Sequence, residues 1–230
     1  MTFPMPVLSP IHTRTPEYGY RTTVTDVSTV SGGVDRTFSG VDIGTANADR
    51  QVIVMFSART ATVATVSSVT IGGVAATPVV GIVGNAGAQI AVYRANVPSG
   101  TTADVVVRLS ASSTDGTIHV YRVVPRTTGT PVDSGSAASN ATTTVTATDI
   151  AVTNGGFLIV GAIDGLNPAS LTPVYNGADS PTNNYGAIVN QRTRLAWSAA
   201  ITETVGTNDP GASKPATNGF NLNVVAASWD

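Results

Sequence analysis

The chain has 230 residues, of which 42% are hydrophobic and only 11% are charged, and its formal net charge is −2. This length allows one large β domain or two small ones, with enough apolar residues for a sizeable core. The small negative charge argues against nucleic acid as a partner, since phosphate binding needs a clustered basic surface, and the absence of cysteine excludes disulfides and thiolate metal sites.

Residues 1–20 contain four prolines, which favour extended backbone and predict an N-terminal arm outside any sheet. A disordered tail would also fit this composition. Five apolar side chains favour an arm that docks on something, because solvated tails are poorer in such residues. These are Phe3, Met5, Val7, Leu8 and Ile11. The segment does not have the pattern of a signal peptide, and no stretch is apolar enough for a membrane helix, so no membrane partner is expected.

From residue 21 onward the sequence alternates between β-branched runs and turns of Gly, Pro, Asn and Asp, which predicts an all-β antiparallel sandwich of jelly-roll type. In the first half, strands are expected at 21–29, 36–43, 50–57, 66–71, 76–82, 89–97, 103–109 and 117–124. In the second half they are expected at 142–152, 156–163, 171–175, 185–190, 194–201 and 219–229. Apolar residues nowhere recur at the spacing of a helix.

Two segments bear on the domain organisation. Residues 127–148 have few large apolar side chains and form either a linker or a polar edge region, so residues 21–230 are one sandwich domain or divide into 21–126 and 127–230. The run "QVIVMF" (51–56) is apolar on both faces. That pattern suits a central strand, or a strand covered by a neighbouring subunit.

The two halves contain similar phrases, which raises the question of a duplication. Residues 41–58 resemble residues 148–163, "ATPVV" (76–80) resembles "LTPVY" (171–175), and "IAVYRA" (90–95) occurs in the same order as "LAWSAA" (195–200). Sequence segments rich in Val and Thr also resemble one another because of their composition alone. Two similar halves, each its own sandwich, and one sandwich shared by both halves therefore remain open.

The sequence offers few residues for catalysis, and no cofactor or metal is expected. His12 lies in the proline-rich segment, and His119 alternates with apolar residues as a strand residue does. Most aspartates stand beside Gly, Asn, Ser or Pro, where a carboxylate commonly accepts hydrogen bonds from turn amides. A polysaccharide-degrading enzyme would need two carboxylates across a cleft, and no local pattern indicates such a pair.

One polar segment with an aromatic ring, residues 176–186, could contact a glycan of a host surface. Its candidate contact residues are Asn176, Asn183, Asn184 and Tyr185. An ordinary long loop between two strands is the simpler interpretation of the same residues.

Several phrases together resemble β-rich virion proteins of tailed bacteriophages and prophages. They are "FSGVDIGTANADRQVIVMFSA", "VSSVTIGGVAATPVV", "IAVYRANVPSGTTADVVVRLS" and "GTIHVYRVV". The resemblance covers residues 38–124 well and the second half loosely. The "SVTIGGVAAT" hairpin and the "ADR" and "VPSGTTADVVV" phrases are its most distinctive parts.

The resemblance implies a non-enzymatic structural protein on the outside of the virion, either capsid decoration or head fibre, or a tail fibre or adhesin module. It carries no catalytic motif. It further implies contacts with other virion proteins, anchoring by residues 1–20, and a homo-oligomer, expected to be a trimer. A protein released by lysis needs neither a secretion signal nor disulfides, which agrees with the composition.

Overall fold

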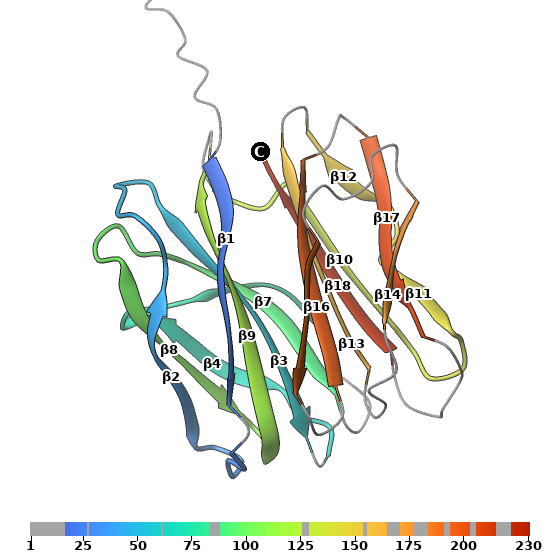
Figure 1. Ribbon diagram of the computed structural model, residues 1–230, viewed down its shortest axis with the longest axis horizontal. Helices are drawn as coiled ribbons and strands as arrows, with labels where there is room; N and C mark the ends of the chain where they lie inside the picture. Colours follow the sequence, from blue (N-terminus) through green and yellow to red (C-terminus); the bar gives the residue numbers. More distant parts are fainter. Residues whose placement is uncertain are drawn as a thin grey trace, which may run out of the picture.

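The computed structural model consists of β-strands and connecting segments in the part of the chain that it describes (Figure 1). The described residues are 17–26, 28–60, 62–82, 88–125, 129–153, 156–164, 171–176, 184–190, 194–202, 206–214 and 222–230. Every strand pairing in them is antiparallel, so the predicted all-β antiparallel fold is confirmed.

The first half of the chain forms one β-sandwich. Its strands are β1 (Glu17–Asp26), β2 (Asp35–Asp42), β3 (Gln51–Thr60), β4 (Val66–Ile71), β5 (Val74–Ala75), β6 (Thr77–Ile82), β7 (Gln89–Asn96), β8 (Thr102–Leu109) and β9 (Ser113–Val124). One sheet has the order β1-β9-β3-β7-β6 and the other β2-β8-β4-β5. Two antiparallel sheets whose neighbouring strands are mostly not consecutive in the chain are typical of jelly-roll-like sandwiches. Phe38, Phe56 and Ile118 lie in the core between the two sheets.

The second half repeats this arrangement. Its strands are β10 (Asp133–Ser139), β11 (Thr144–Thr146), β12 (Ile150–Val152), β13 (Phe157–Asp164), β14 (Thr172–Asn176), β15 (Asn184–Asn190), β16 (Arg194–Thr202), β17 (Gly206–Ser213) and β18 (Leu222–Trp229). The order β10-β18-β13-β16-β15 matches β1-β9-β3-β7-β6 strand for strand, and β17 pairs with β11, β12 and β14 as β8 pairs with β2 and β4. Its own core includes Leu158, Val160 and Val224.

The two sandwiches pack face to face through their five-stranded sheets, which gives four layers (Figure 1). Ile53, Met55 and Tyr121 of the first sandwich share an apolar cluster with Phe157 and Trp229 of the second. The whole of β3 except Arg59 is buried as a result. The strand that is apolar on both faces is therefore covered by the other half of the same chain.

Several predictions from the sequence need correction. The composition predicts a proline-rich arm up to residue 20, but β1 begins at Glu17 and pairs with β9. Three strands, β5, β10 and β17, are absent from the predicted ranges, and the single strand predicted at 142–152 is two strands, β11 and β12. The match of "ATPVV" with "LTPVY" is wrong, because it equates β6 with β14. β6 belongs to a five-stranded sheet, whereas β14 belongs to a four-stranded sheet and pairs with β17. The other two matches fall on equivalent strands.

The glycine turn in "SVTIGGVAAT" forms as predicted. Gly72 and Gly73 both have positive φ, of 59° and 78°, and join β4 to β5. Two successive positive φ values suit the right-handed twist of a two-residue hairpin, and glycine adopts them without strain.

Candidate functional site

His119 is a structural residue in the first sandwich rather than an accessible base. It is 1% exposed and lies on the face of β9 that carries Tyr121, which is turned toward the second sandwich. Its Nδ1 lies 3.3 Å from Oγ1 of Thr23, and that hydroxyl is 2.6 Å from the hydroxyl of Tyr20. Burial lowers the pKa of His119 to about 4, so the ring is neutral at neutral pH. His12 lies outside the described residues.

Some carboxylates accept hydrogen bonds from nearby turn amides, as predicted, and others form ion pairs with arginines or accept from amides distant in the sequence. Asp26 accepts a hydrogen bond from the amide of Ser28, and Asp42 accepts one from the amide of Gly44. Burial opposes ionisation of Asp26, but the bonds from Ser28 and the charge of Arg36 leave its pKa below the ordinary value. Within the described residues, no three His, Asp or Glu side chains gather in a way that could hold a metal ion.

The predicted anchoring residues Phe3, Met5, Val7, Leu8 and Ile11 lie outside the described residues. The described part of the chain begins at Glu17, which forms an ion pair of 2.9 Å with Arg122. This contact attaches the first residue of β1 to β9 of the first sandwich.

The next residues attach the start of β1 to both sandwiches. Tyr18 stacks on Phe157 with ring centroids 4.8 Å apart, and Phe157 stacks on Trp229 at 5.5 Å. Stacked aromatic pairs contribute about 0.5–1.5 kcal/mol beyond their burial. The start of β1, where the described part of the chain begins, therefore lies at a junction to which both sandwiches contribute.

The predicted glycan contacts are split between two sheets. Asn176 ends β14 and pairs with Asp209, whereas Asn184 and Tyr185 begin β15 and pair with Ala199 and Ser198. Tyr185 is thus a strand residue rather than part of a loop. Asn183 lies outside the described residues.

The start of β1 and the described part of the predicted glycan-contact region lie at the same end of the molecule. Glu17 pairs with Val124 at the end of β9, and Phe157 pairs with Trp229 next to the C-terminal residue. Since β14 and β16 run toward this end, Asn176 and the start of β15 lie there too. Figure 1 shows the start of β1 and the C-terminus at the same end. If residues 1–16 attached the chain to a partner, the predicted glycan contacts would lie on the side nearer to that partner.

Arg50, the arginine of the "ADR" phrase, links the loops at this same end. It is fully buried, and its guanidinium donates to the carbonyl oxygens of Val97 at 2.7 Å, Ser99 at 2.6 Å, Gly100 at 2.9 Å and Gly44 at 2.6 Å. The planar guanidinium has enough donors for several carbonyls at once. This contact joins the "ADR" and "VPSG" phrases in space.

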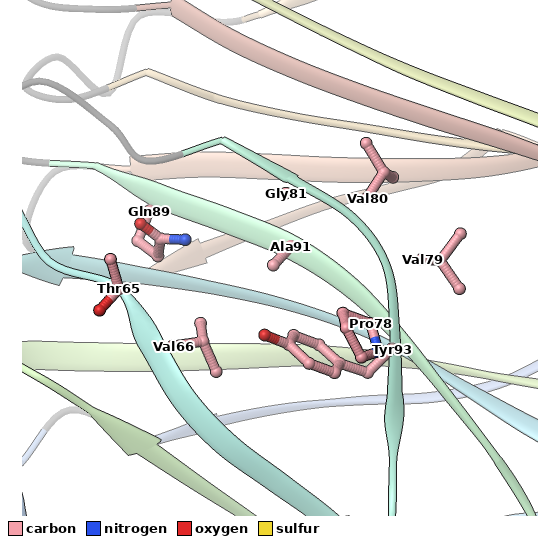
Figure 2. Close-up of a pocket in the computed structure, with 9 residues that line it drawn as sticks. All are labelled: Thr65, Val66, Pro78, Val79, Val80, Gly81, Gln89, Ala91 and Tyr93. Atoms are coloured by element: carbon pink, nitrogen blue, oxygen red, sulfur yellow. The ribbon is translucent and has the colours of Figure 1, made fainter.

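A pocket of about 340 Å³ opens along an edge of the first sandwich (Figure 2). Thr65 and Val66 at the start of β4 form one wall, residues 78–81 of β6 form another, and Gln89, Ala91 and Tyr93 of β7 complete it. In Figure 2 the hydroxyl of Tyr93 points toward Val66.

Sequence analysis missed this pocket. Its residues come from three strands and carry no motif. Only the alternation of Gln89, Ala91 and Tyr93 along β7, which puts a carboxamide and a phenol on one face, hinted at it.

No helix in the described residues is long and apolar enough to cross a membrane. The chain matches no protein-family model, and no curated protein matches it.

Proposed function

We propose that this chain is a non-enzymatic structural protein on the exterior of a tailed-phage particle, where it decorates the capsid or forms a head fibre. The motifs of residues 38–124 suggest this class. The tandem sandwiches suit it, because antiparallel double sheets hold a stable shape and present a large surface. The buried ionisable groups Arg50 and His119, held by carbonyls and a hydroxyl, have structural contacts rather than catalytic ones.

The attachment of β1 to both sandwiches is the observation that most favours anchoring through the N-terminal segment. Tyr18 contacts Phe157 of the second sandwich, and Glu17 forms an ion pair with Arg122 of the first. A load on residues 1–16 would therefore be shared by the whole molecule. Other virion proteins are the proposed partners of that segment, and the proposed assembly is a homotrimer.

The truncation that tests anchoring should remove residues 1–16 and keep Glu17. A cut after residue 20 would also remove the stacking of Tyr18 and would confuse lost attachment with lost stability. We expect the chain of residues 17–230 to fold as the full chain does, with an unchanged melting temperature, but not to co-sediment with particles. Co-sedimentation equal to that of the full chain would contradict anchoring by this segment.

Electron cryo-microscopy of intact particles tests the location. Regular density for this chain on the capsid lattice is the expected result. Density confined to the tail tip or baseplate would favour the alternative, a tail fibre or a receptor-binding or glycan-binding adhesin. Particles without any density for the chain would overturn both.

A further inference from the structure

Among the described residues that line the pocket of the first sandwich, none has a charged side chain. Its polar groups are the carboxamide of Gln89, the hydroxyl of Tyr93 and residue Thr65, and the rest of the wall is apolar. Burial raises the pKa of Tyr93, so its phenol stays neutral. A lining of this kind does not compensate the charge of an anion or a cation, because a desolvated ion needs an opposite charge or several directed hydrogen bonds.

Gln89 provides an acceptor that lacks a partner. The residue is 3% exposed, and its Oε1 has no hydrogen-bond donor in the part of the chain that the structure describes. A buried acceptor without a donor costs about 1–3 kcal/mol. That oxygen has almost no accessible surface, so a ligand hydroxyl reaches it only if the carboxamide turns and exchanges the places of Oε1 and Nε2, whereas a purely apolar ligand would leave the acceptor without a donor.

We propose that this pocket binds one neutral sugar unit of a glycan. A pyranose ring has hydroxyls that can donate to Gln89 and can exchange hydrogen bonds with the hydroxyl of Tyr93. Its C–H faces are apolar enough to pack on Val66 and Pro78. The volume of about 340 Å³ lies at the small end of the range of ligand pockets, about 300–1,000 Å³, which suits a single ring rather than a long chain.

The position of the pocket keeps it away from the proposed anchor. Gln89 pairs with Ala58, which also pairs with Gly116, and Gly116 pairs with Asp26 at the end of β1. Gln89 therefore lies at the end of the first sandwich opposite Glu17. If residues 1–16 attach the chain to a particle, this end faces the medium. The orientation of this end toward the medium rests on the proposed function, whereas sugar binding by the pocket does not.

The experiment uses the full chain in solution and methyl glycosides of glucose, galactose, mannose, N-acetylglucosamine and rhamnose, each up to about 50 mM. Binding is followed by NMR as amide shifts mapped on the sequence. We expect at least one glycoside to shift residues 65–66, 78–81 and 89–93. Shifts elsewhere only, or none with any glycoside, would overturn the proposal.

Two variants and a matched control identify the contacts. Gln89→Leu and Tyr93→Phe should each weaken binding by roughly fivefold, the worth of one hydrogen bond. Gln51→Leu is the control, since Gln51 is equally buried and its Oε1 also lacks a partner in the described residues, but it does not line the pocket. Equal affinities in all four proteins would contradict the assignment.

The two proposals can fail separately. Particle location is read by microscopy and sugar binding on the isolated chain. A chain found on the capsid that binds none of the glycosides refutes the pocket alone, and a chain that binds a glycoside but is absent from particles refutes the location alone.

Discussion

His119 couples the stability of the fold to pH through its burial. The unfolded chain takes up the proton near the ordinary pKa of 6.5, whereas the folded chain resists it until about pH 4. Because the unfolded state binds more protons in this window, the free energy of unfolding is highest above pH 6.5 and falls as the pH drops toward 4.

We therefore expect the free energy of unfolding to fall by up to about 3 kcal/mol between pH 6.5 and pH 4, the equivalent of the shift in pKa of His119. Urea denaturation at a series of pH values measures it. In His119→Gln the curve should be flatter over the same window. If the free energy of unfolding of His119→Gln fell with pH as steeply as that of the original chain, other groups would be responsible for the pH dependence.

Among the individual strands, β10 and β17 show why parts of the fold were not predictable from the sequence. β10 contains only Asp, Ser, Gly and Ala, residues with low β-propensity. It forms an edge strand because β18 beside it provides the hydrogen-bonding partner. The sequence indicated a linker or a polar edge for residues 127–148, and within that range β10 is an edge strand of the second sandwich.

β17 was missed because of Pro210, which argues against a strand inside a sheet. The structure accommodates this proline at a break in its neighbour. On one side of β17, β11 ends opposite Gly211 and β12 begins opposite Asn208. Pro210 lies between these two positions, so no strand pairing there requires the backbone N–H that proline lacks. Asp149 adopts a φ of 59° in this break. Such compensation between distant segments cannot be predicted from local sequence.

The pairing of elements across the layers gives a second prediction. Gly161 of β13 lies under Met55 of β3, and a methyl group at Gly161 would overlap the sulfur of Met55. Gly161→Ala should lower the free energy of unfolding by about 1–3 kcal/mol through overpacking. In a Met55→Ala background the same change should cost less than about 1 kcal/mol, as measured by urea denaturation.

Gly19→Ala is the matched control, since a methyl group on that strand glycine meets nothing within 4 Å. It should leave stability nearly unchanged. An equal cost of Gly161→Ala in both backgrounds would mean that the layers do not meet at Met55.

For the whole molecule, the class of fold and most strands were predictable, but the number of layers was not. The run "QVIVMF" indicated a strand that is buried on both faces. A second subunit and a second sandwich of the same chain would cover that strand equally well, so the pattern did not distinguish between them. The pocket was unpredictable for a related reason, because Thr65 and Gln89 are brought together only by the packing of β4 and β7.

The face-to-face packing predicts that neither half is self-sufficient. Residues 17–129 alone would expose Ile53, Met55, Ile90 and Tyr121, and an apolar patch of this kind promotes association. We expect each isolated half to self-associate and the two halves together to form a one-to-one complex, measured by light scattering after size exclusion. Stable monomeric halves that ignore each other would contradict the role of this interface.

The attachment of β1 also determines how the molecule would respond to mechanical pulling. A force on residues 1–16, with the body held at the opposite end, acts along the axis of β1 and loads its ladder with β9 in shear. The hydrogen bonds must then break together rather than one after another. The ring of Tyr18, clamped on Phe157, resists the first sliding step. The start of β1 should therefore withstand a pull along its axis better than a pull that peels it from β9.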